Sequence, residues 1–146
     1  MRSMHKMNVT IKFGTDHIDW KEVCLIFERA PLGKREPEKL RRAALNSHIV
    51  CSAYDSDTIV GFGRAISDGE YQSAIYDVVV MPEYQGQGVG RTIMESLLQH
   101  LPKGPVLIYA VLGKEGFYRK IGFGDLKTGM GLFPNPEKAR SNGYLV

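Results

Sequence analysis

Gln85-Gly86-Gln87-Gly88-Val89-Gly90 is the stretch that decides the fold of this chain. It lies between the apolar run Val78–Val80 and a helical pattern that begins near Arg91. A strand, a glycine-rich turn and a helix in this order form a phosphate site, because glycines let the backbone approach a ligand and the N–H groups at a helix start point at anionic oxygens. The stretch therefore predicts a phosphate-bearing ligand, with a turn whose glycines serve packing alone as the alternative.

The spacing of the glycines excludes two familiar phosphate motifs. The sixth place from Gly86 is Arg91, so the Rossmann pattern fails, and no Gly-Lys-Ser/Thr ends the loop as a Walker A motif requires. The pattern that fits is Gln/Arg-x-x-Gly-x-Gly/Ala, with Gln85, Gly88 and Gly90 in the fixed places. This resembles the pyrophosphate loop of the GNAT superfamily of N-acetyltransferases, which binds acetyl-coenzyme A.

A second segment strengthens the resemblance. Phe117-Tyr118-Arg119-Lys120-Ile121-Gly122-Phe123 is similar to the Phe-Tyr-x-Lys-x-Gly-Phe signature of the same superfamily. The resemblance implies that Tyr118 contacts the coenzyme and protonates the leaving thiolate, since a nearby O–H donor assists such a leaving group. An amphipathic core tyrosine is the alternative.

The resemblance also implies how the coenzyme is held. Backbone groups of Val79 and Val80 would pair with the pantetheine arm as an added strand does. Arg91 and Thr92 follow the last glycine and would add side-chain contacts to phosphate. An exposed helix arginine is the alternative for Arg91. The expected coenzyme contacts are Val79, Val80, Gln85, Gly86, Gln87, Gly88, Val89, Gly90, Arg91, Thr92 and Tyr118.

Asp77 is the candidate for handling the acceptor amine. It interrupts an otherwise apolar strand, where a carboxylate is costly unless it has a partner or a task. Ile75–Val80 resembles strands of polyamine, glucosamine-phosphate and plant serotonin acetyltransferases, in which an acid at this place holds or deprotonates the amine. A structural aspartate, the weaker candidates Glu70 and Glu115, and a water relay stay open as alternatives.

One position departs from the superfamily. Many members carry an asparagine seven places before the tyrosine, and Val111 stands there in this chain. The backbone of Gly113 or the amine of Lys114 is expected to replace that contact to the coenzyme arm.

Composition bounds the class of protein. A chain of 146 residues with 43% apolar residues is expected to form one GNAT domain over residues 1–146. The net charge of +3 suits an anionic coenzyme, and no basic stripe interleaved with aromatic residues indicates nucleic acid. Cys24 and Cys51 read as buried free thiols, no cluster has metal-ligand spacing, and no apolar run is long enough for a membrane span. The basic N-terminus lacks the apolar region of a secretory signal, so we expect a cytoplasmic protein.

The periodicities predict an α/β chain with a twisted mixed sheet of about six to seven strands and about four helices, as in the GNAT fold. Asp19 is the expected N-cap of the first helix and Pro37 lies in the first turn of the second. The predicted strands are Val9–Phe13, His48–Tyr54, Thr58–Ile66, Ser73–Val80, Pro105–Leu112, Phe123–Lys127 and Gly129–Phe133, and the predicted helices are Trp20–Ala30, Pro37–Leu45, Gly88–Leu101 and Gly113–Ile121.

These observations favour direct acetyl transfer from acetyl-CoA to a primary amine of a small molecule, with an aralkylamine or a polyamine as the leading hypothesis. A protein acceptor and an acyl-CoA-binding regulatory module without turnover are the alternatives, and a homodimer is possible. Most of the aromatic residues considered for an amine pocket are expected in the core. They are Trp20, Phe27, Tyr54, Tyr71 and Tyr76.

Overall fold

The computed structural model describes residues 8–146, which divide into two compact units, one ending at Ile108 and one running from Tyr109 to Val146. The expectation about a secretory signal falls on the N-terminal seven residues and lies outside the described part. The single domain over residues 1–146 stays a prediction.

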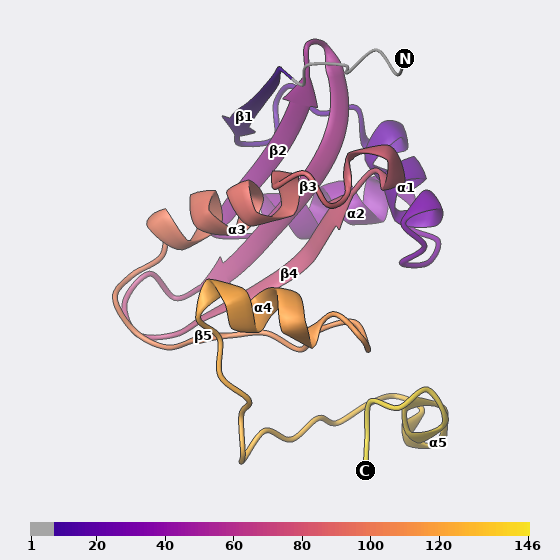
Figure 1. The fold of residues 1–146 in the computed structure, drawn as a ribbon, viewed down its shortest axis with the longest axis vertical. Helices are drawn as coiled ribbons and strands as arrows, with labels where there is room; N and C mark the ends of the chain where they lie inside the picture. The colour runs from indigo at the N-terminus through magenta and orange to yellow at the C-terminus, as the bar shows by residue number, and fades with distance from the viewer. Residues whose placement is uncertain (1–7) are drawn as a thin grey trace, which may run out of the picture. The chain divides into compact units, whose positions relative to one another are not determined.

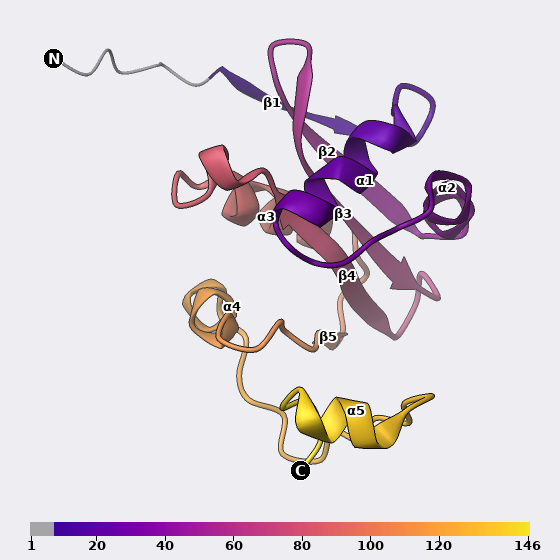
Figure 2. The ribbon, with the colours of Figure 1, turned by 90° about the vertical axis from the view of Figure 1, so that its right-hand side faces the viewer.

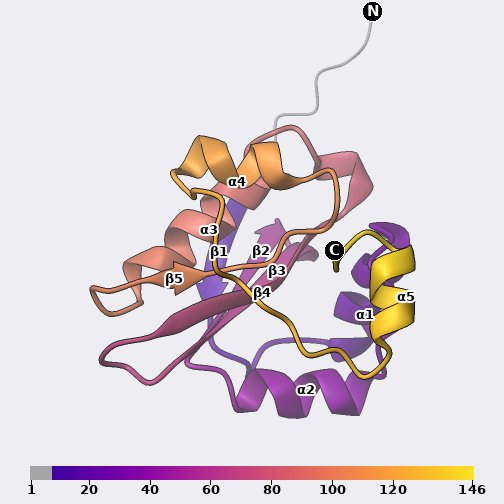
Figure 3. The same cartoon turned by 90° about the horizontal axis from the view of Figure 1, so that it is seen from below.

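The first unit is a mixed sheet with helices on both faces (Figures 1 and 2). Within residues 8–108 the strand order is β1-β2-β3-β4-β5, with antiparallel pairs from β1 to β4 and a parallel pair between β4 and β5. Helices α1 and α2 cover one face and α3 covers the other (Figure 3). The elements are β1 Val9–Phe13, α1 Trp20–Arg29, α2 Pro37–Leu45, β2 Ile49–Asp55, β3 Thr58–Ser67, β4 Ser73–Val80, the 3-10 turn η1 Pro82–Tyr84, α3 Val89–Gln99 and β5 Val106–Leu107.

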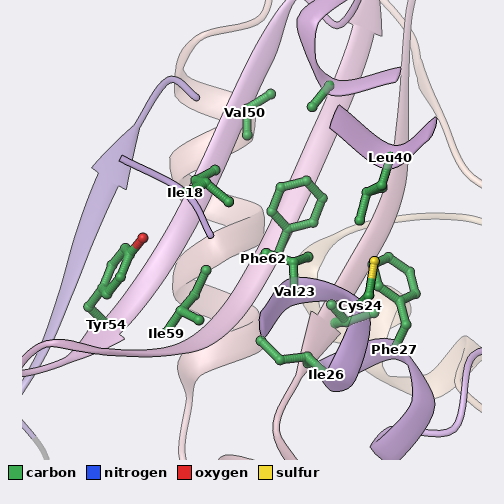
Figure 4. Packing of buried hydrophobic residues seen from close by; sticks show 12 residues of the cluster. Ile18, Val23, Cys24, Ile26, Phe27, Leu40, Val50, Tyr54, Ile59 and Phe62 are labelled. Atoms are coloured by element: carbon green, nitrogen blue, oxygen red, sulfur yellow. The ribbon is translucent and has the colours of Figure 1, made fainter. Parts of the chain in front are cut away.

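Helix α1 forms where the sequence predicts it, and it makes one half of the core. Asp19 caps it by accepting a hydrogen bond from the Lys21 N–H at 3.0 Å. Its apolar stripe points at the sheet, where Phe27 and Phe62 are both fully buried with ring centroids 6.5 Å apart (Figure 4). Burial of two such aromatic rings contributes about 3–6 kcal/mol of hydrophobic free energy before entropy is counted.

Helix α3 lies unusually close to β3 because two glycines of that strand face it. A Cβ added to Gly61 would stand 2.7 Å from the Cδ1 of Ile93, and one added to Gly63 would stand 2.8 Å from the Cγ2 of the same side chain. Ile93 and Leu97 are fully buried in this contact. The glycines therefore fix the depth at which α3, and with it the loop at its N-terminus, is seated.

The second unit contains α4 Glu115–Ile121 and α5 Pro136–Ser141. The α/β fold class is confirmed, but the strand count is lower than expected, because residues 8–146 contain five strands. Predicted strands Phe123–Lys127 and Gly129–Phe133 are absent from the described residues, and Pro105–Leu112 shrinks to Val106–Leu107. Apolar alternation suffices for a strand only where another strand supplies hydrogen-bond partners, and Met130 and Leu132 are fully exposed.

Both cysteines are buried free thiols, as expected. Burial raises the pKa of Cys51 to about 12, with a hydrogen bond from the Ser96 side chain opposing the rise. The Cys51 thiol therefore stays protonated and unreactive in the folded protein.

We expect Gly61→Val to destabilise the first unit by about 1–3 kcal/mol, because the new side chain overpacks the contact with Ile93. Urea unfolding followed by circular dichroism measures this loss. Gly116→Ala is the control, since a Cβ at that helical position meets nothing within 4 Å and alanine favours a helix by about 1 kcal/mol. Equal midpoints for Gly61→Val and the wild type would contradict the close seating of α3.

Candidate functional site

The loop before α3 presents bare backbone to solvent. Gly86 and Gly88 adopt left-handed φ angles of 76° and 87°, and a Cβ added to either would meet nothing within 4 Å. Residues 85–88 are all exposed. Gly88 is the N-cap of α3 and supplies no side-chain cap, and the first backward hydrogen bond of the helix runs from the Thr92 N–H to the Gly88 carbonyl at 3.0 Å. The amides that precede Thr92 are the ones that a helix leaves without internal acceptors, so the loop suits an anion.

Side chains around the loop hold its backbone in this form. The Gln85 amide Nε2 donates to the Val80 carbonyl at 3.0 Å, and the Gln87 amide donates to the Glu83 carbonyl at 3.0 Å. The Thr92 hydroxyl donates to the Gly88 carbonyl at 2.9 Å. These three predicted contact residues therefore shape the loop by their side chains, and the N–H groups of Gln85 and Thr92 are already bonded to the Pro82 and Gly88 carbonyls.

Arg91 pairs with Glu95 one turn along the helix, with Nε 2.9 Å from Oε1. Both side chains are more than half exposed, so the pair is weak and can open toward an anion. Val89 and Gly90 form the first turn of α3, where Val89 is buried and anchors the helix start.

Strand β4 carries a bulge next to the loop. Val79 pairs with Phe62 and Tyr76 pairs with Arg64, so that Asp77 and the residue after it lie opposite the single Gly63. Asp77 has a φ of 60°, a left-handed conformation that is strained for a residue with a side chain. Bulges of this kind re-aim side chains and gather beside active sites.

The other edge of β4 is mostly uncovered within residues 8–108. β5 pairs only with Ser73 and Ala74, and β4 continues to Val80 without a parallel neighbour there. The edge that includes Val79 and Val80 can accept an extended ligand arm as a further strand.

The Asp77 carboxylate is held by two arginines. Arg64 Nε donates to Oδ2 at 2.7 Å, and Arg35 donates to Oδ1 at 2.8 Å and to Oδ2 at 3.3 Å. The side chain of Asp77 is 9% exposed. The hydrogen bonds of the Asp77 carboxylate given above come from arginine side chains and not from the backbone.

The sequence analysis missed both arginines. Arg64 is a charged residue inside the apolar strand β3. Asp77 was singled out because it interrupts an apolar strand in the same way, so this signal could also have found Arg64. Arg35 lies in the loop between α1 and α2 among other charged residues, and nothing in that loop distinguishes it.

The other candidate acids are exposed or locally engaged. Glu70 lies in a loop, where its N–H donates to the Asp68 carboxylate at 2.8 Å. Glu115 lies in the first turn of α4 and its Oε2 accepts from the Gly113 N–H at 2.9 Å. That bond engages the Gly113 amide, and Lys114 is the N-cap of α4, with its N–H bonded to the Val111 carbonyl.

Tyr118 lies on α4 in the second unit. Its ring meets Phe117 and Phe123 edge-on, at centroid distances of 5.0 Å and 5.9 Å. Burial raises the pKa of the hydroxyl above its ordinary value of 10, so the group stays protonated at neutral pH. A protonated, half-buried phenol is suited to donating a proton.

The aromatic residues proposed for an amine pocket divide between core and surface. Phe27 and Tyr54 are buried, Trp20 packs edge-on against Phe62, and Tyr71 is 75% exposed. Tyr76 lies under the Arg64 guanidinium, 5.7 Å from it.

Comparison with known proteins assigns the family. The acetyltransferase (GNAT) family model matches residues 16–123, so the chain belongs to the GNAT family. The chain is 34% identical over 126 residues to serotonin N-acetyltransferase 2, chloroplastic, of Oryza sativa subsp. japonica, covering 80% of this chain and 63% of the rice protein. It is 30% identical over 120 residues to the histone acetyltransferase TAP1 of Glycine max, covering 73% and 52%. The chain therefore spans about half to two thirds of these relatives.

A solved structure shows the same fold. A probable acetyltransferase from Staphylococcus aureus superposes with a TM-score of 0.75 at 25% identity, over 86% of this chain and 99% of that one. The family match and this superposition confirm the GNAT resemblance drawn from the two motifs.

The expectation of a cytoplasmic protein is wrong. The rice relative is named chloroplastic, and so is GCN5-related N-acetyltransferase 2 of Arabidopsis thaliana, which is 33% identical over 62% of this chain and 44% of its own length. These names place those two relatives in the chloroplast, against the expectation of a cytoplasmic protein. The expectation rested on free cysteines and on the lack of a secretory signal pattern. Neither feature distinguishes the cytoplasm from a chloroplast. In the part of the chain that the structure describes, no helix is long and apolar enough to cross a membrane.

We expect Gly88→Val to lower the affinity for acetyl-CoA by about tenfold or more, because its Cβ occupies the open space above the loop. Isothermal titration calorimetry measures the dissociation constant. Gly14→Val is the matched control, since Gly14 has a similar φ of 88° and equally open surroundings outside the loop. Both variants carry backbone strain of about 1–2 kcal/mol. Undiminished binding by Gly88→Val would contradict a phosphate site in this loop.

Proposed function

We propose that the protein is an acetyl-CoA-dependent N-acetyltransferase that acetylates the primary amine of a small molecule. The observation that carries the proposal is the exposed glycine loop of residues 85–88 at the N-terminus of α3, beside the uncovered edge of β4. Family membership supports acetyl-CoA as the ligand of this backbone. Acetyl-CoA supplies an activated acetyl thioester.

The amides of the loop and the partial positive charge of the helix start fit a diphosphate. The open space over Gly86 and Gly88 allows the approach, and the positive net charge of +3 favours the encounter. We propose that Val79 and Val80 hold the pantetheine arm by backbone hydrogen bonds. Because Gln85 already donates to the Val80 carbonyl, that acceptor is shared or exchanged when the ligand binds.

An acceptor that arrives as an ammonium must lose two protons, one before its nitrogen attacks and one after, and the leaving sulfur must gain one. The amine nitrogen bonds to the acetyl carbon, the carbon–sulfur bond breaks, and the sulfur leaves as a thiolate. We propose that Tyr118 donates its hydroxyl proton to that thiolate, for which its raised pKa keeps the proton in place. The two protons lost by the acceptor nitrogen pass to Glu70, Glu115 or a water relay, from which one returns to the Tyr118 phenolate and one goes to solvent.

Asp77 is proposed as the anchor of the acceptor cation. Both of its oxygens already accept from guanidinium groups, so the site is built to hold a positive charge. A small aralkylamine or polyamine is the favoured acceptor class, and the name of the rice relative supports an aralkylamine.

A protein amine is the second candidate acceptor, favoured by the name of the soybean relative. A screen of thiol release with acetyl-CoA separates the candidates, using tryptamine, spermidine and a lysine-rich peptide as acceptors. Turnover of the small amines supports the proposal, turnover of the peptide alone supports the second candidate, and acetyl-CoA binding without any turnover supports a regulatory module.

We expect Tyr118→Phe to lower kcat by about a hundredfold, the lower end of the range for loss of an acid catalyst. The dissociation constant of acetyl-CoA should stay within about twofold, because no charge or volume is removed. Steady-state kinetics and calorimetry measure the two effects. The control is Tyr71→Phe, which deletes an equivalent hydroxyl from an exposed side chain. An unchanged kcat would remove Tyr118 from the mechanism.

The pH profile of the wild type gives an independent check. The acid must be protonated to act, and its pKa is raised above 10, so ionisation of Tyr118 should reduce kcat only above pH 10. The measurement is kcat between pH 7 and pH 10.5 at saturating substrates. A decline of kcat centred well below pH 10 that disappears in Tyr118→Phe would contradict the raised pKa.

A further inference from the structure

We propose that Arg35 competes with the acceptor for Asp77. Its guanidinium occupies the carboxylate in the empty enzyme, and the ammonium of an aromatic amine displaces it and stacks its ring where Arg35 lay. Arg64 is a positioning residue that keeps the carboxylate fixed during the exchange. The inference rests on the proposed function.

The two arginines reach Asp77 from different kinds of structure. Arg64 comes from the neighbouring strand β3, its side chain is 15% exposed, and Nη1 also donates to the Ser47 hydroxyl at 3.3 Å. Arg35 comes from the irregular loop between α1 and α2, and its side chain is 37% exposed. Gly33 precedes it with a left-handed φ of 98°. Arg64 is therefore fixed by its surroundings, and Arg35 is the partner that can leave.

The hydrogen bonds of Arg35 within residues 8–146 all go to Asp77. Its guanidinium also lies over the face of Phe27, 4.5 Å from the ring centroid. Water screens this pair on the Arg35 side, where the side chain is 37% exposed, so an incoming cation can replace the guanidinium. The replacement conserves charge, because one monovalent cation leaves the carboxylate as another arrives.

The surface under Arg35 indicates the chemistry of the acceptor. Phe27 is fully buried while the guanidinium covers it, and departure of Arg35 bares its ring face. An aromatic ring two or three carbons from the ammonium can cover this face again, as the planar guanidinium did. A polyamine covers it less well, so the arrangement favours an aralkylamine.

Asp77 is suited to this exchange because its own geometry is set by the fold. The bulge in β4 and the φ of 60° aim the carboxylate at the face that carries α1 and α2. Aspartate is among the few residues with side chains that tolerate this φ. The strain is retained beside a functional group, as is common at binding sites.

The test compares steady-state kinetics of Arg35→Gln and the wild type with tryptamine at saturating acetyl-CoA. Removal of the competing group should lower KM for tryptamine about two- to fivefold and leave kcat unchanged. Arg41→Gln is the matched control, since it removes an equally charged α2 side chain that pairs with Glu38 instead. In an Asp77→Asn background the Arg35→Gln change should have no effect on KM.

Two further measurements separate this proposal from other roles of the arginines. Arg64→Gln should raise KM for tryptamine and Arg64→Lys should restore part of it, while acetyl-CoA affinity measured by calorimetry stays unchanged in both. If Arg35 instead binds an anionic group of the acceptor, Arg35→Gln will raise KM for tryptophan and leave tryptamine unaffected. That outcome, or an unchanged or raised KM for tryptamine, overturns the proposal.

Failure of the proposed function gives a different result. If the wild type turns over no amine, N-acetyl transfer to small amines is wrong, and the competition is then tested by titrating tryptamine calorimetrically into both proteins. Tighter binding by Arg35→Gln supports displacement of Arg35, and equal or weaker binding overturns it.

Discussion

The contact of α3 with two side-chain-free positions of β3 is the constraint on which the site depends. Ile93 fills the space over Gly61 and Gly63, so neither strand position can carry a side chain unless the helix moves. Between the end of β4 at Val80 and the start of α3 at Val89, the chain forms the 3-10 turn η1 and the glycine loop. Gly86 and Gly88 adopt left-handed φ angles in that loop and place no side chain beside the amides of the first helical turn.

One edge of β4 pairs with β3, and most of the other edge is open to a ligand. Its pairing with β3 runs almost the full length, whereas β5 covers only its first two residues. An uncovered strand edge is normally a liability because its N–H and C=O groups attract other strands. Here the open edge lies next to the backbone proposed to bind phosphate, so a single extended molecule could contact both. The bulge at Asp77 belongs to the same strand, which gathers the proposed coenzyme and acceptor contacts on one element.

Much of this was predictable from local sequence, and the failures have physical causes. The loop from Gln85 to Gly90, the stripe of α1 and the interrupting Asp77 are signals contained in a few consecutive residues. The partners of Asp77 lie 13 and 42 residues away, and a loop arginine has no periodicity that reveals its contact. The segment 123–133 has the composition of strands, but composition does not supply the neighbouring strand that pairing requires. The short α5 was missed because its six residues carry too little pattern, although Asn135 caps it.

The charges around Asp77 bear on what the acceptor can be. Two guanidinium groups and one carboxylate leave a net charge of +1 in a partly buried place. If the acceptor simply added to this cluster, its ammonium would meet two cations and would pay desolvation without a free acceptor oxygen. If it replaces Arg35, the charge of the cluster is conserved and the displaced guanidinium, on its loop, returns to water. The proposed exchange conserves the charge of the cluster, and it would make the loop between α1 and α2 a determinant of acceptor choice.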